Sequence, residues 1–148
     1  FRRVLCRSAF VAAEIHADGV HIGQSDMDAA KARKILGPDS IIGVTAKTVE
    51  QALKAQAEGA DYLGSGAVFG TTTKSDAKPM DIDTLNAICD SVDIPVVAIG
   101  GINNDNVMKL SGSRIAGIAV VSGIFDNKDI KGAAQSLRAK ALNIISGR

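Results

Sequence analysis

Short apolar runs alternate with amphipathic segments along nearly the whole chain. Several of these runs begin after a small or acidic turn and leave through a glycine. Short apolar runs of this kind are typical of parallel strands, and the run that starts at Tyr62 is expected to be buried on both faces. Five strands are predicted: Ala17–Gly23, Ile41–Thr45, Gly59–Gly66, Val96–Gly101 and Ile115–Gly123.

Helix signals fill the gaps between the strands. Ser25 or Asp26 is the predicted N-cap of one helix, and Thr48 with Gln51 forms the capping box of the next. Asp81 caps a third helix, which follows a proline. The other helices are predicted at about residues 8–16, at 104–110 and from 127 onward, the last with an apolar stripe along one face.

Strands that alternate with helices require a parallel sheet with right-handed crossovers. A doubly wound open sheet and a (β/α)8 barrel both satisfy this order. No Gly-x-Gly-x-x-Gly motif follows the first strand, and phosphate-type loops sit on the final two strands, so the barrel is favoured. A complete barrel takes about 250 residues, more than the 148 present here. The prediction is an α/β fold, a single domain over residues 1–148 that forms an incomplete TIM barrel with about strands 4 to 8.

Composition narrows the function classes. The net charge is +1, which gives no basic field for nucleic acid, and 46% of the residues are apolar. No apolar run approaches the ~20 residues of a membrane span. The two cysteines, Cys6 and Cys89, have no metal-ligand spacing, and reduced thiols in a cytoplasmic protein are expected.

The stretch Tyr62–Lys74 carries the strongest chemical signal. A buried strand is followed by three adjacent hydroxyls and an ammonium, Thr71, Thr72, Thr73 and Lys74. Ligands of parallel α/β proteins bind outside the carboxyl ends of the strands. This loop is therefore predicted to hold an anion, most plausibly a phosphate, and solvated threonines with a surface lysine are the alternative.

Five motifs, in order, resemble thiamine-phosphate synthases over nearly everything after residue 17. They are Gly19-Val-His-Ile-Gly-Gln-Ser-Asp26, Gly43-Val-Thr45, Tyr62-Leu-Gly with Thr71-Thr-Thr-Lys74, Ala98-Ile-Gly-Gly-Ile102 and Val120-Val-Ser122. The resemblance implies a (β/α)8 barrel and a transferase of thiamine biosynthesis. Such an enzyme joins 4-amino-2-methyl-5-hydroxymethylpyrimidine diphosphate to a thiazole phosphate, with Mg²⁺, and releases pyrophosphate.

The same resemblance assigns roles to individual residues. It implies that Asp26 ligates Mg²⁺ and that Thr45 and Lys74 contact the diphosphate, with Lys74 as the catalytic group that stabilises the leaving group. The thiazole phosphate would be bound by Thr71, Thr72, Thr73, Gly101, Val121 and Ser122. Without the resemblance, Asp26 is equally well a helix cap, and Gly101 serves a tight turn.

The chain also departs from the family's pattern. The family carries an Asn-Asp pair, whose Asp is the other Mg²⁺ ligand, where Cys6 and Arg7 stand here, and a Gln-x-Arg-x-Lys strand is missing. Residues 1–7 are therefore interpreted as a foreign or frame-disrupted leader, and residues 17–148 as the family-like region. A diverged homologue without activity is the alternative, and the chain as given is expected to be inactive.

Other interpretations stay open at this point. A thiazole tautomerase shares the barrel but has no use for a diphosphate, and a sugar-phosphate isomerase explains the glycines only. A non-catalytic phosphate-binding barrel fragment is also possible, and open strand edges would favour self-association. His21 lies in the middle of a strand and is expected to be a buried, hydrogen-bonded histidine rather than a general base.

Overall fold

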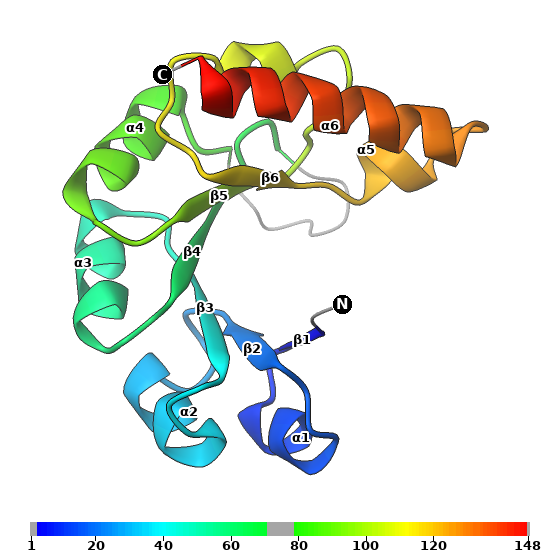
Figure 1. Ribbon diagram of the computed structural model, residues 1–148. Helices are drawn as coiled ribbons and strands as arrows, with labels where there is room; N and C mark the ends of the chain where they lie inside the picture. Colours follow the sequence, from blue (N-terminus) through cyan, green and yellow to red (C-terminus); the bar gives the residue numbers. More distant parts are fainter. Residues whose placement is uncertain (1–2, 71–78, 148) are drawn as a thin grey trace.

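The computed structural model describes residues 3–70 and 79–147. They form a curved parallel sheet with helices on its outer side (Figure 1). In chain order the elements are β1 (Val4–Cys6), α1 (Ala9–Glu14), β2 (Gly19–Ile22), α2 (Ala29–Leu36), β3 (Ile41–Thr45), α3 (Val49–Ala57), β4 (Tyr62–Gly66), α4 (Ile82–Ser91), β5 (Val96–Ile99), the 3-10 helix η1 (Val107–Leu110), β6 (Gly117–Ala119), α5 (Ser122–Phe125) and α6 (Ile130–Ser146).

The strand order decides between the two candidate architectures. All strand pairs are parallel, and the sheet order β1-β2-β3-β4-β5-β6 follows the chain. A doubly wound sheet reverses its strand order at a switch point and carries helices on both faces. Here the sheet curves around an open concave side, and the helices lie along its outer side (Figure 1). The fold is therefore a partial barrel, as the sequence predicts.

Alternate strand residues pack against small residues of the helices. Three helices each bury two alanines spaced three apart, so that the helix axis comes close to the sheet. These alanines are at most 3% exposed: Ala9 and Ala12, Ala29 and Ala32, Ala52 and Ala55. Their partners in one continuous core cluster include the strand residues Val20, Ile22, Ile42, Val44 and Leu63.

The predicted number of strands is wrong. The described residues form six strands, because Val4–Cys6, within the segment interpreted as a leader, pairs with β2. This strand is only three residues long and follows two arginines, so its apolar pattern is too short to stand out. β4 is buried from Leu63 to Gly66, as predicted, whereas Ile99 of β5 is 41% exposed on the concave side.

Several helix boundaries also differ from the prediction. Asp28, not Ser25 or Asp26, caps α2 by accepting the Lys31 N–H at 2.8 Å. Thr48 and Asp81 cap α3 and α4 as predicted. The segment 104–110 contains only the 3-10 turn η1, and the short α5 was not predicted.

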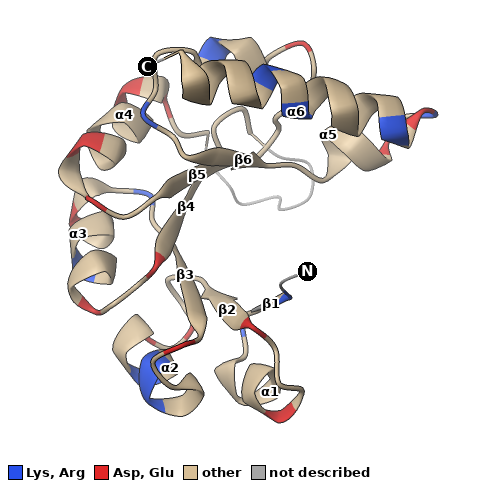
Figure 2. Ribbon diagram, viewed as in Figure 1, with Lys and Arg blue, Asp and Glu red and all other residues tan. Residues whose placement is uncertain are grey.

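Charged side chains of both signs are spread over the helices and their connecting loops (Figure 2). Among the described helices, α2 and α6 carry only basic charged residues and α4 only acidic ones, so the near-neutral net charge is a balance between elements. Among the described helices, none combines the length and the apolar character that a membrane crossing requires.

We expect the chain to self-associate through the outer edges of its sheet. Within the described residues, β1 pairs only with β2 and β6 only with β5, so each end strand leaves unpaired backbone groups that can extend another sheet. Sedimentation velocity should show dimers or larger species, and Val4→Lys on β1 should weaken this association several-fold.

The matched control is Val11→Lys on α1. Val4 and Val11 are similarly exposed, at 37% and 44%, but Val11 lies away from the strand edge. Equal effects of the two substitutions, or a monomer at every concentration, would contradict edge pairing.

Candidate functional site

The carboxyl ends of β2 and β3 carry two residues of the predicted site, Asp26 and Thr45. After β2 the chain turns, and the Asp26 carboxylate accepts the Gly23 N–H at 2.8 Å. Gln24 donates from its side-chain amide to the backbone carbonyl of Thr45, at the end of β3. Because Asp28 takes the helix-capping role, Asp26 is not needed as a cap. The backbone N–H of Lys31, more than any other group, lowers the pKa of Asp28.

A guanidinium faces Asp26 from the end of β1. Arg7 Nε lies 3.9 Å from Asp26 Oδ1, with side-chain exposures of 76% and 18%. The described part of the chain contains no group of three or more His, Cys, Asp or Glu side chains able to hold a metal. Mg²⁺ takes one or two carboxylates and would be repelled by an adjacent guanidinium. The described residues therefore do not fit a magnesium ion at Asp26.

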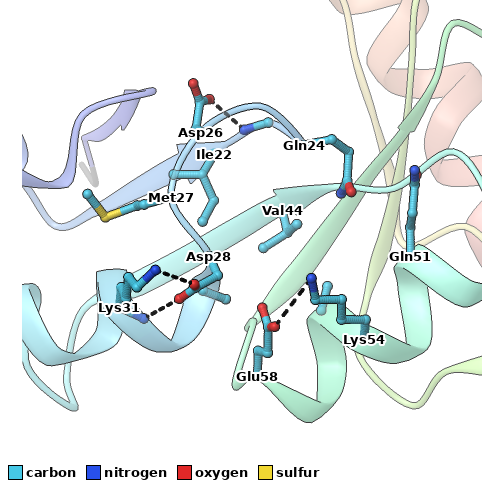
Figure 3. A pocket seen from close by; sticks show the side chains of 13 residues that line it. Ile22, Gln24, Asp26, Met27, Asp28, Lys31, Val44, Gln51, Lys54 and Glu58 are labelled. Atoms are coloured by element: carbon cyan, nitrogen blue, oxygen red, sulfur yellow. Dashed lines mark hydrogen bonds and ion pairs between the residues drawn. The ribbon is translucent and has the colours of Figure 1, made fainter.

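A cavity of about 240 Å³ lies between α2 and α3. Two ion pairs line it, Asp28 with Lys31 at 3.0 Å and Glu58 with Lys54 at 3.7 Å. Asp26 belongs to its rim, but its carboxylate points away from both pairs (Figure 3). Because the four charged groups of these ion pairs neutralise one another, the cavity offers none of them unpaired to a substrate.

A second hollow, of about 380 Å³, lies at the carboxyl ends of β5 and β6. Its lining includes Gly101 and Ser122, which the sequence predicted as neighbours at a phosphate. Gly101 has φ +65°, and a Cβ there would lie 2.5 Å from the carbonyl oxygen of Gly70. Only glycine thus allows this close approach of two loops. Asp105 and Asp126 also line the hollow, so an anion there would have to be held by hydroxyl and backbone N–H groups.

Asparagines brace this hollow, and the sequence analysis did not identify them. The Asn106 side chain donates to the Gly101 carbonyl at 2.8 Å and accepts the Asn103 N–H at 2.9 Å. Asn127 donates to the carbonyl of Gly123 at 2.9 Å. The signal was present in the run Asn103-Asn-Asp-Asn106, where side-chain-to-backbone turns are favoured. These bonds fix the backbone of the loops that line the hollow.

The predicted site residues fall into two groups. Gly101 and Ser122 share the hollow at β5 and β6, whereas Asp26 and Thr45 lie at β2 and β3. Val121 is 61% exposed and is not part of the hollow's lining. Neither of the two cavities contains residues from both groups. The predicted anion-binding residues Thr71, Thr72, Thr73 and Lys74 lie outside the described residues.

The side chains of His21, Tyr62 and Thr45 form a hydrogen-bonded cluster on the sheet. His21 Nδ1 lies 2.9 Å from the Tyr62 hydroxyl, and Nε2 lies 3.0 Å from Thr45 Oγ1. The hydrogen bonds agree with the expectation for His21, but its side chain is only partly buried. Burial, and secondarily the neighbouring Cys6 thiol group, raise the pKa of Tyr62 above its ordinary value of 10.0.

We expect Tyr62 to ionise at higher pH in the folded chain than in the unfolded one. Because the folded state favours the neutral phenol, its stabilising contribution is complete below pH 10 and is lost as pH rises through the folded pKa. Tyr62 is the single tyrosine, so the near-ultraviolet absorbance of tyrosinate measures this pKa directly. The denatured chain is the reference, and coincident titration curves would contradict the expected shift.

Comparisons with known proteins identify the family of the chain. A family model described as thiamine monophosphate synthase matches residues 7–124. Thiamine-phosphate synthases of Ruminiclostridium cellulolyticum and Clostridium tetani are 55% and 53% identical over 127 residues, which is 86% of this chain and 60–61% of theirs. The solved thiamine phosphate pyrophosphorylase of Pyrococcus furiosus superposes with a TM-score of 0.86 at 39% identity, over 96% of this chain and 68% of that one.

A more distant solved structure, a 3-hexulose-6-phosphate synthase, is 20% identical with a TM-score of 0.67 and shares the fold. The chain spans about 60% of the length of the curated relatives it matches. The long family match and the high identity to several synthases lead to one conclusion: the chain belongs to the thiamine monophosphate synthase family.

Proposed function

We propose that this chain supplies the later strands of a thiamine-phosphate synthase, with the part of the active site that binds phosphorylated substrates. The reaction would be the transfer of the hydroxymethylpyrimidine group from its diphosphate to the thiazole phosphate. The observation that carries the proposal is the hollow at β5 and β6, where Gly101 and Ser122 lie together in a chain 55% identical to a synthase. Its two free cysteines support a cytoplasmic location.

The proposed roles follow from the charge that the reaction develops. Breaking the bond to pyrophosphate leaves negative charge on the leaving group, which Lys74 would stabilise while Thr45 donates a hydrogen bond to it. Thr71, Thr72 and Thr73 would join Gly101, Val121 and Ser122 at the thiazole phosphate. Mg²⁺ would neutralise diphosphate charge in a complete site of the family.

Arg7 argues that this chain alone does not complete that site. It faces Asp26 at 3.9 Å, in the region where a cation would have to be bound. We therefore propose that the chain binds phosphate groups but does not turn over substrate by itself. The same observation favours one alternative to a part in synthase catalysis, namely a phosphate-binding protein that has no catalytic role at all.

The proposed function is tested by separating binding from turnover. The purified chain should form no thiamine phosphate from both substrates with Mg²⁺, yet it should bind thiazole phosphate in calorimetry. Ser122→Ala should weaken this binding about tenfold, which corresponds to one hydrogen bond to a charged group.

Ser91→Ala is the matched control, because Ser91 Oγ donates to the Ile88 carbonyl at the end of α4, away from the hollow. Turnover by the unmodified chain would refute the proposed inactivity. Equal binding by both serine variants would refute the assignment of Ser122.

Replacement of Arg7 should change the response to metal. The unmodified chain should bind Mg²⁺ weakly or not at all, whereas Arg7→Asp places a second carboxylate opposite Asp26 and should create measurable binding. Calorimetry with Mg²⁺, supported by water-proton relaxation with Mn²⁺, measures the change.

The control for net charge is Arg3→Asp, the same substitution on an exposed residue before β1. If the unmodified chain binds Mg²⁺ as well as the Arg7→Asp variant does, the guanidinium does not block the site. If Arg3→Asp has the same effect as Arg7→Asp, the gain is a general charge effect.

A further inference from the structure

The cluster formed by His21, Tyr62 and Thr45 spans three neighbouring strands. In the sheet register, His21 of β2 lies beside Gly43 of β3, which lies beside Tyr62 of β4. A side chain on the middle strand would normally separate the outer two. A Cβ at position 43 would lie 2.2 Å from the Tyr62 ring, so the ring occupies the space that glycine leaves.

A second glycine makes room for the imidazole. A Cβ at Gly64 would lie 2.9 Å from His21 Cε1. The two rings consequently lean toward each other across β3, with centroids 5.4 Å apart and planes inclined at 38°. The two glycines thus hold the imidazole where both of its nitrogens can be hydrogen-bonded, one to Tyr62 and the other to Thr45.

The direction of these bonds determines what Thr45 can offer to a ligand. A neutral imidazole has one donor and one acceptor nitrogen. If Tyr62 donates to Nδ1, then Nε2–H donates to Thr45 Oγ1 and the threonine hydrogen is free to point elsewhere. In the reverse direction Nε2 consumes that hydrogen, and Thr45 presents lone pairs that would repel an anion.

One observation favours the first direction, and a second one fixes the place of the Thr45 hydroxyl. The half-buried Tyr62 hydroxyl carries its proton at neutral pH and lies 2.9 Å from Nδ1, so it can satisfy its donor there. Thr45 is also held through its backbone, where its carbonyl accepts from Gln24. The threonine hydroxyl is therefore fixed at the carboxyl end of β3, the edge at which ligands of such sheets bind.

We propose that His21 is a positioning residue that turns the Thr45 hydroxyl into a hydrogen-bond donor for a phosphate oxygen, with Tyr62 selecting the Nε2–H tautomer. This inference rests on the proposed function, in which Thr45 contacts the diphosphate. It assigns to the His21–Tyr62 pair a role in anion affinity rather than in proton transfer.

The tautomer is tested first, without any ligand. The chain has two histidines, so nitrogen-15 spectra of the imidazoles need to separate only His21 from His16. His21 should show the Nε2–H tautomer, and Tyr62→Phe should shift it toward a mixture while leaving His16 unchanged. A dominant Nδ1–H tautomer in the unmodified chain would overturn the proposed direction.

The functional consequence is tested with inorganic pyrophosphate in calorimetry. His21→Leu removes the donor to Thr45 and should weaken binding about tenfold, the value of one hydrogen bond to a charged group. His21→Gln keeps a side-chain N–H donor and should recover most of that loss. His16→Gln, on the exposed second histidine, is the control.

A comparison of single and double variants separates the effect of His21 on the Thr45 hydroxyl from an effect on folding. Thr45→Val should lose the same affinity, and His21→Leu combined with Thr45→Val should lose no more than Thr45→Val alone. Additive losses, or full affinity in His21→Leu, would overturn the positioning role. Thermal unfolding of every variant identifies those that fold. Tyr62→Phe removes only one oxygen atom, and it should weaken pyrophosphate binding less than His21→Leu does.

The experiments distinguish failure of the Thr45 contact from failure of the His21 role. Absence of pyrophosphate binding by the unmodified chain would refute the contact of Thr45 with the diphosphate, and the anion role of His21 with it. Normal binding with the wrong tautomer, or with no effect of His21→Leu, would refute the His21 mechanism and leave the proposed function standing.

Discussion

The close packing of alanine-faced helices against one side of the sheet is the interaction on which this structure depends. Three successive helices present two buried alanines each, spaced by three residues, to the aliphatic side chains of the strands. Small residues let each of these helices lie near its strand, so these three βα units share one way of packing. Repeating that geometry in one direction curves the sheet and keeps the strands in chain order (Figure 1).

This regularity fixes where chemistry can occur. Because all strands are parallel, their carboxyl ends lie along one edge, and the loops that leave them are neighbours whatever their separation in the chain. Asp26 and Thr45 come from the ends of β2 and β3, and Gly101 and Ser122 from β5 and β6. The glycines of the concave face have a complementary role, since they leave room for rings that larger side chains would exclude.

Local signals were sufficient for elements whose own residues determine them. Thr48 and Asp81 cap helices as predicted because each hydroxyl or carboxylate reaches an N–H three residues away. The cap of α2 was misplaced because Ser25, Asp26 and Asp28 are all suitable residues, and the tertiary path of the chain after β2 selects Asp28. The strand Val4–Cys6 was missed because its pairing with β2, not its own composition, makes it a strand.

The residues of the site also divide into those that the local sequence indicates and those that only the tertiary structure reveals. The sequence indicated Gly101 and Ser122, and the structure brings them together, but the bracing asparagines required knowledge of which carbonyls they reach. The partners of His21 were equally inaccessible, since Tyr62 lies 41 residues away and meets it only through the register of three strands.

A guanidinium that follows a strand can lie beside a carboxylate of the next βα turn without disturbing the sheet. Arg7 directly follows β1, and its backbone N–H donates to the His21 carbonyl at 2.8 Å, so the hydrogen bonding of the sheet continues to that residue. Its side chain nevertheless brings a positive charge to the carboxylate of Asp26. The hydrophobic core lies on the helix side of the strands and includes neither Arg7 nor Asp26. The fold therefore persists with a guanidinium, rather than a second carboxylate, beside Asp26.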